Sequence, residues 1–121
     1  MILDHCRNEA ELKLLYKKRP LPNQYDWDFL INNPNLFCFY DEKSEKLRGY
    51  ITVQIENDLL TLSGASVRKN MTDNINAIVK VCEALDNDVY SFTRVKPAII
   101  CLLRAGFKHI KDDKFVRYKN G

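Results

Sequence analysis

The sequence predicts a mixed α/β domain, in which one mostly antiparallel sheet lies between helices. Three apolar or alternating segments follow one another over residues 36–67 with short polar links, which is typical of an antiparallel meander. Segments with helical spacing then alternate with strand-like segments to the end of the chain. This mixed order requires helices on both faces of a central sheet.

The first third of the chain predicts one short strand and two helices. Met1-Ile2-Leu3 reads as a strand, and Asn8 followed by Glu11 is typical of the start of a helix, here predicted over residues 9–18. A second, shorter helix is predicted over residues 23–33, where Asn-Asn-Pro ends it.

The meander and the last third supply the remaining elements. Asn57-Asp58 predicts a tight hairpin, and Gly49 and Gly64 inside strands predict bulges or a close backbone approach. Asp73 is predicted to cap a third helix, and a fourth is expected from Pro97 to Gly106. The predicted order is β-α-α-β-β-β-α-β-α-β-β, with strands at residues 1–3, 36–40, 47–55, 59–67, 88–94, 107–111 and 115–118.

Composition limits the class of protein. With 121 residues, 45% of them hydrophobic and 29% charged, the chain predicts a single domain over residues 1–121. A net charge of +3 without a basic tract indicates no nucleic-acid partner. Neither a membrane span nor a signal pattern is found, so we expect a cytoplasmic protein. Cys6, Cys38, Cys82 and Cys101 form no CxxC pair, so free thiols are favoured over disulfides or metal ligands. No metal is expected, because neither His5 nor His109 has a second candidate ligand at the spacing of a metal site.

A family resemblance rests on the run from Val95 to Phe107, which reads Val-Lys-Pro-Ala-Ile-Ile-Cys-Leu-Leu-Arg-Ala-Gly-Phe. Together with the order of elements, this run resembles the GNAT acyltransferase superfamily, whose last main helix often carries N-x-x-A-I-x-x-Y-x-x-x-G-F. The resemblance covers the whole chain as topology and thirteen residues as a motif. It implies the splayed GNAT sheet, with acetyl-CoA as ligand and an amine as acceptor.

The loop that binds pyrophosphate in this family is degenerate here. The family pattern is Q/R-x-x-G-x-G/A, whereas residues 67–77 contain no glycine, and Asn74 and Asn76 stand at the glycine positions. The resemblance makes Val67, Arg68, Lys69, Asn74 and Asn76 the cofactor-side candidates. A solvated turn is the favoured interpretation of Arg68 and Lys69, and Asp73 would repel an anion at the helix terminus.

The residues for proton transfer are also largely missing. Leu102 occupies the position of the family's general-acid tyrosine, and Val95 that of its asparagine. Glu56, acting through water, and Ser63 are the weak catalytic candidates, although an exposed strand end explains Glu56 more simply. Tyr25, Asp26 and Trp27 lie in the segment that resembles the acceptor side, where a capped, half-buried amphipathic helix is the favoured alternative.

These departures favour a GNAT-fold protein with weak or no acyl-CoA binding and a structural or binding role, in contact with a protein partner or with copies of itself. Short GNAT-like proteins are also encoded by tailed bacteriophages, some virion-associated, which suggests the host cytoplasm or a virion as location. The alternative is an active acetyl-CoA-dependent N-acetyltransferase acting on a small amine or a protein amine. A nucleic-acid binder is disfavoured, because Asp112 and Asp113 dilute the basic C-terminal hairpin.

Overall fold

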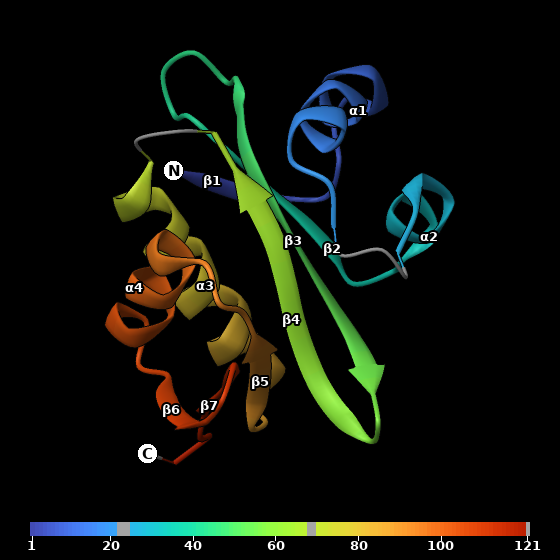
Figure 1. The fold of residues 1–121 in the computed structure, drawn as a ribbon. Coiled ribbons are helices and arrows are strands. Elements are labelled where there is room, and N and C mark those ends of the chain that lie inside the picture. The colour runs from blue at the N-terminus through green and yellow to red at the C-terminus, as the bar shows by residue number, and fades with distance from the viewer. Residues whose placement is uncertain (22–24, 68–69, 121) are drawn as a thin grey trace.

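A computed structural model describes residues 1–21, 25–67 and 70–120. Within these residues the predicted order of elements is confirmed (Figure 1). The elements are β1 (Ile2–Asp4), α1 (Glu9–Lys18), α2 (Trp27–Asn32), β2 (Leu36–Tyr40), β3 (Leu47–Glu56), β4 (Leu59–Ser66), α3 (Met71–Leu85), β5 (Val89–Phe92), α4 (Lys96–Arg104), β6 (Lys108–Lys111) and β7 (Lys114–Arg117).

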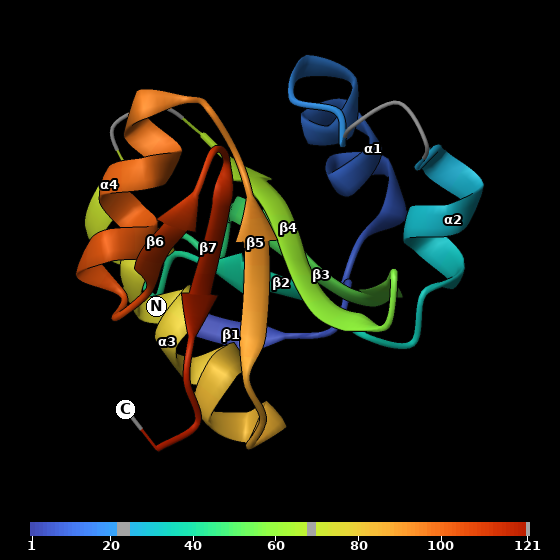
Figure 2. The same cartoon turned by 60° about the horizontal axis from the view of Figure 1, so that its bottom comes forward.

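All the strands join one sheet with the order β1-β2-β3-β4-β5-β7-β6. Neighbouring strands are antiparallel except β4 and β5, which are parallel. β5, β7 and β6 lie side by side in Figure 2. The mixed, mostly antiparallel sheet is thus as the sequence predicts.

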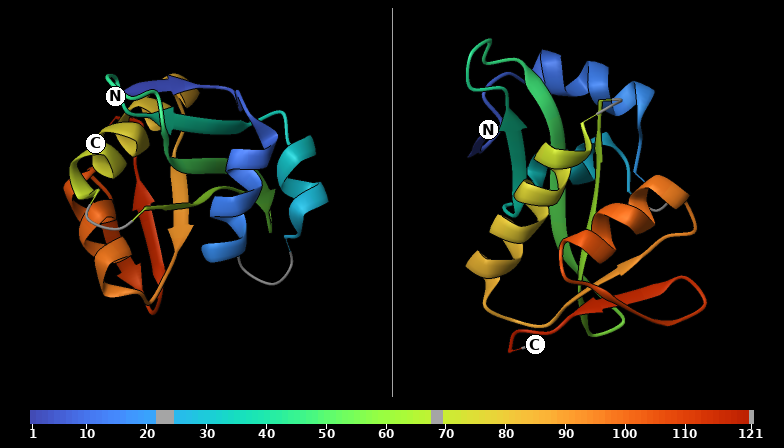
Figure 3. Two further views of the ribbon diagram at one scale, coloured as in Figure 1. Left: turned by 90° about the horizontal axis from the view of Figure 1, so that it is seen from above. Right: turned by 90° about the vertical axis from the view of Figure 1, so that its left-hand side faces the viewer.

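Helices cover both faces of this sheet (Figure 3). On one face, α1 and α2 bury Leu12 and Leu30 against Cys38 and Tyr50. On the other face, α3 and α4 pack on Val53 and neighbouring strand residues in a second apolar cluster. Because side chains alternate along a strand, β3 contributes Tyr50 to the first cluster and Ile51 and Val53 to the second.

Turns and glycines largely follow the sequence pattern. Asn57 and Asp58 both have positive φ, at 48° and 66°, as a tight hairpin requires. A Cβ atom on Gly49 would lie 2.1 Å from Phe39 Cζ, and one on Gly64 would lie 2.3 Å from the Tyr50 carbonyl oxygen. Close approach therefore applies to both glycines, and a bulge also adjoins Gly49, since Phe39 pairs with Gly49 whereas Tyr40 pairs with Leu47.

Two predicted helix starts are wrong. α2 begins at Trp27 and not near residue 23, because the Asp26 side chain accepts the Phe29 N–H and caps the helix there. α3 begins at Met71, so Asp73 lies in its first turn, and the N-cap position belongs to Asn70. At the end of α4, Gly106 has a φ of 95°, as expected for a glycine after a helix C-cap.

Three further properties concern the described residues. All four cysteines are free thiols, and only Cys6 is not buried. No helix in residues 1–21, 25–67 or 70–120 has the length and apolar character to cross a membrane. The same ranges contain no cluster of His, Cys, Asp and Glu able to hold a metal ion.

Candidate functional site

The two parallel strands of the sheet form a single residue pair in the described structure. β4 and β5 pair solely at Thr61 and Tyr90, where the buried Ser91 hydroxyl also donates to the Leu62 carbonyl at 2.9 Å. Beyond that point β5 continues alongside β7, and Phe92 pairs with Lys114. The second half of β4 therefore has no strand on its β5 side within the described residues, and the sheet opens into a splay.

The open edge of β4 presents main-chain groups to this splay. Val67 N–H donates to the Arg48 carbonyl at 2.9 Å, which sets the alternation of hydrogen-bonded pairs between β3 and β4. Gly64 and Ser66 then fall at positions that direct N–H and C=O away from β3. A ligand with amide groups in an extended chain finds donors and acceptors there, as an added strand would.

The N-terminus of α3 lies beyond the end of β4 and carries buried donors without a partner. Asn70 is 8% exposed, makes no side-chain cap, and accepts from Arg48 Nη2 at 3.4 Å. Asn70 Nδ2 and Arg48 Nε have no hydrogen-bond partner in the described part of the chain. Two buried donors beside a helix N-terminus favour an anion, whereas the Asp73 carboxylate in the first turn opposes one.

Side chains from α3 bridge part of the splay. The Asn74 amide donates to the Ser66 hydroxyl at 2.5 Å and also interacts with the Cys101 thiol of α4. Near the start of α3, Arg104 Nη1 donates to Met71 Sδ at 3.3 Å. These contacts join the end of β4 to α4, so a ligand entering here displaces them.

The cofactor-side candidates are brought together only in part. Val67 lies at the end of β4, and Asn74 contacts Ser66 one residue before it. Asn76 is exposed on α3. Arg68 and Lys69 lie outside the described residues. The sequence interpretation missed Arg48 and Asn70, since a single arginine in a strand and an asparagine before a helix carry no distinctive motif.

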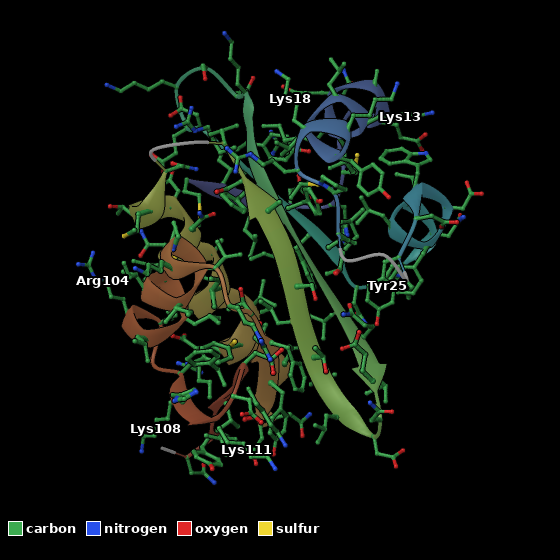
Figure 4. All side chains as sticks on the ribbon, viewed as in Figure 1. Lys13, Lys18, Tyr25, Arg104, Lys108 and Lys111 are labelled. Atoms are coloured by element: carbon green, nitrogen blue, oxygen red, sulfur yellow. The ribbon has the colours of Figure 1, made fainter. Side chains whose placement is uncertain are left out.

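The acceptor-side candidates pack together over the end of β3. The Tyr25 hydroxyl donates to the Glu56 carboxylate, and the Tyr25 ring stacks on Phe29 with centroids 4.3 Å apart. Figure 4 labels Tyr25 near the start of α2. Trp27 is half-buried, and the centroid of its ring lies 5.7 Å from that of the Tyr16 ring. With Asp26 as the N-cap, the expected capped, half-buried amphipathic helix is confirmed.

Ser63 lies on the α1–α2 side of β4, opposite Thr52. Gln54 Nε2 donates to its hydroxyl at 3.3 Å, and no carboxylate, imidazole or amine is bonded to it in the described structure. Glu56 is level with Leu59, four residues from Ser63, which is about 13 Å along the strand. Gln54 Oε1 and Thr52 Oγ1 are buried without a partner in the described residues, so this face retains two unused acceptors.

The helix that resembles the family motif buries the position of its general acid. Leu102 is 4% exposed and belongs to the α3–α4 core, whereas Val95 is 61% exposed at the helix start. Burial also raises the pKa of the neighbouring Cys101 thiol. Neither Leu102 nor Val95 has a side chain that donates a proton, and Cys101 stays a neutral thiol at pH 7.

No protein-family model and no curated protein matches the sequence. Two solved structures share the fold. A GnaT-family acetyltransferase from Bordetella pertussis is similar at a TM-score of 0.67 and 12% identity, over 89% of this chain and 86% of that one. An acetyltransferase of the GNAT family from Streptococcus pneumoniae is similar at a TM-score of 0.62 and 11% identity, over 95% of this chain and 94% of that one. The chain therefore has the GNAT acetyltransferase fold.

Proposed function

We propose that this protein binds an acyl-CoA weakly in the splay between β4 and β5 and transfers the acyl group slowly or not at all. The observation that carries the proposal is the open edge of β4 at Gly64 and Ser66. The pantetheine arm of CoA is an extended chain with two amides, so it can hydrogen-bond to such an edge. A thioester carbonyl beside the same N–H groups would be polarised.

The donors at the N-terminus of α3 can bind the phosphate end of the ligand. Arg48 Nε and Asn70 Nδ2 supply donors that have no acceptor among the described residues, and an arginine–phosphate bond is among the stronger hydrogen bonds. The Asp73 carboxylate repels the phosphates, and the ligand must displace the Asn74–Ser66 hydrogen bond, so both weaken binding. We therefore expect a dissociation constant of about 0.1–1 mM, which is weak for this fold.

Slow transfer follows from the residues near the splay. Leu102 cannot protonate a departing thiolate, and Ser63 has no base bonded to it in the described structure. Glu56 lies too far along β3 for direct contact with an amine at Gly64. Orientation by the β4 edge is then the main remaining contribution, and it raises the rate only if the acceptor is also held in place.

Calorimetric titration with acetyl-CoA tests the binding. Arg48→Met should weaken binding about five-fold or more, and inorganic pyrophosphate should compete in the wild type but not in this variant. Lys43→Met, which removes one charge from the exposed β2–β3 turn, is the matched control and should bind as the wild type does. Absence of binding at 5 mM acetyl-CoA would disprove the proposal.

An active N-acetyltransferase is the second candidate. Gln54 Oε1 and Thr52 Oγ1, which have no partner in the described part of the chain, favour it because they can accept a hydrogen bond from an amine near Ser63. Thiol release from acetyl-CoA is measured over a panel of small and peptide amines, in the wild type and in Gln54→Leu. A rate above the protein-free background that falls in Gln54→Leu would establish this candidate. A background rate throughout supports the binding role.

A structural role with a protein partner or with copies of the same chain belongs to this proposal, as does a phage setting, with the host cytoplasm or a virion as location. The support is the sequence resemblance together with the absence of an acid at Leu102. Light scattering across a range of protein concentrations tests self-assembly. A mass that stays at 14.2 kDa at every concentration would exclude self-assembly, and the structural role would then need a different protein as partner.

A further inference from the structure

β6 ends the sheet as an exposed edge strand. In the sheet order it pairs with β7 alone, and all four of its residues are exposed. Its outer main-chain N–H and C=O groups thus have no strand neighbour in the described part of the chain. An edge of this kind is a template for another extended chain. The opposite edge strand, β1, is only three residues long and half-buried.

The sequence segment that contains β6 carries a net positive charge, although Asp112 and Asp113 follow the strand directly. Residues 89–121 hold eight of the 19 lysines and arginines but only two of the 16 acidic residues, so their net charge is +6, whereas residues 1–88 sum to −3. Lys108 and Lys111 begin and end β6 and lie at one end of the molecule in Figure 4. Between them Ile110 is 45% exposed, and Leu103 on the neighbouring α4 is 49% exposed.

A second copy of the chain is a poor occupant of this edge. If two β6 strands paired antiparallel, Lys108 of one would face Lys111 of the other, and like charges directly opposite each other are destabilising. Lysines on an edge strand are a known means of preventing self-association. The occupant must therefore bring negative charge.

A single-stranded nucleic acid fits less well than a peptide. Phe107 and Phe115 are each 3% exposed and offer no stacking surface. The Tyr90 and Tyr118 rings already lie under lysine ammonium groups, at 5.2 Å from Lys114 and 5.9 Å from Lys108. Nucleic acid would also leave the main-chain edge unused, whereas an extended peptide bonds to it.

We infer that β6 is a docking edge for an extended acidic segment of another protein, which adds to the sheet beside β6 and places carboxylates against Lys108 and Lys111. Main-chain hydrogen bonds would supply affinity, and the lysines would select negative charge. This surface belongs to the C-terminal hairpin and does not depend on acyl-CoA binding.

Fluorescence anisotropy with a labelled (Glu-Val)4 peptide tests the inference on the whole protein, with (Lys-Val)4 as the opposite probe. K108E/K111E should weaken binding of the acidic peptide at least ten-fold and gain binding of the basic one. The control variant K13E/K18E changes the net charge by the same amount on exposed sites of α1, far from β6 in Figure 4. Its affinity for the acidic peptide should stay within two-fold of that of the wild type. Equal losses in both variants would overturn the inference.

Main-chain pairing is tested with two N-methylated forms of the acidic peptide, one methylated on the glutamates and the other on the valines. An added strand bonds through alternate residues, so one form should lose binding and the other keep it. Equal binding of both forms would contradict strand addition. Tighter binding of a twelve-nucleotide oligo-dT at the same lysines, or a dimer that K108E/K111E dissociates, would assign the edge to another occupant and reject the inference.

Discussion

At the scale of single residues, Asn74 is the side chain that most directly limits the splay. Its amide holds the Ser66 hydroxyl at the open end of β4 and interacts with Cys101 across from it. A neutral hydrogen bond of this kind contributes about 1 kcal/mol, so a ligand can displace it at a modest cost in affinity.

Removing that bridge should strengthen acyl-CoA binding. In Asn74→Ala we expect acetyl-CoA to bind about three- to ten-fold more tightly by calorimetry, because the ligand no longer competes with the amide. Asn76→Ala changes an exposed residue of the same type two positions along α3 and should have no effect. Unchanged binding would show that the bridge does not compete with the ligand, and weaker binding would show that Asn74 itself holds it.

Leu102 gives a second prediction at this scale. Leu102→Tyr restores the residue type expected at the general-acid position, but the site is 4% exposed in the α3–α4 core. We expect about 1–3 kcal/mol of destabilisation in urea unfolding from overpacking, and no gain in thiol release. Leu102→Met, which conserves volume, should cost less than about 1.5 kcal/mol. A gain in activity would mean that α4 shifts enough to expose this side chain.

The candidate site could be predicted from the sequence only where family motifs mark it. The missing glycines and the leucine at position 102 are visible in the sequence. Arg48 and Asn70 meet only because β3 and the start of α3 are neighbours in space, 22 residues apart along the chain. The Tyr25–Glu56 contact likewise joins residues 31 positions apart. Local periodicity carries no information on such pairs.

At the scale of elements, the tight contact between β2 and β3 at Gly49 gives a prediction. A Cβ at this position would lie 2.1 Å from Phe39 Cζ and 2.8 Å from the Ala65 carbonyl oxygen. Gly49→Ala should therefore destabilise the fold by about 1–3 kcal/mol in urea unfolding. Adding Phe39→Leu should recover part of the loss, since only the ring contact is relieved. No recovery in the double variant would place the strain on the main chain alone.

Element boundaries show what local patterns determine. The Asn57-Asp58 hairpin and the α1 cap at Asn8, which accepts the Glu11 N–H at 3.1 Å, follow directly from short-range chemistry. The start of α3 does not, because Asp73 has the right residue type for a cap but the helix already begins at Met71. The splay itself follows from the single β4–β5 residue pair and has no sequence signal.

At the scale of the whole molecule, buried groups that stay protonated predict loss of stability at high pH. Burial raises the pKa of Tyr40 and of the Cys38 thiol to about 12, and that of the Cys82 thiol to about 11. In the unfolded chain these groups ionise near pH 9–10, so between that pH and about 12 the folded state binds more protons. The free energy of unfolding should then decrease as pH rises from about 9, by at most about 1.4 kcal/mol per pH unit for each group. Urea unfolding from pH 8 to 11 measures this slope, and Tyr40→Phe should flatten it above pH 10. A stability that stays constant over this range would mean that water reaches both apolar clusters.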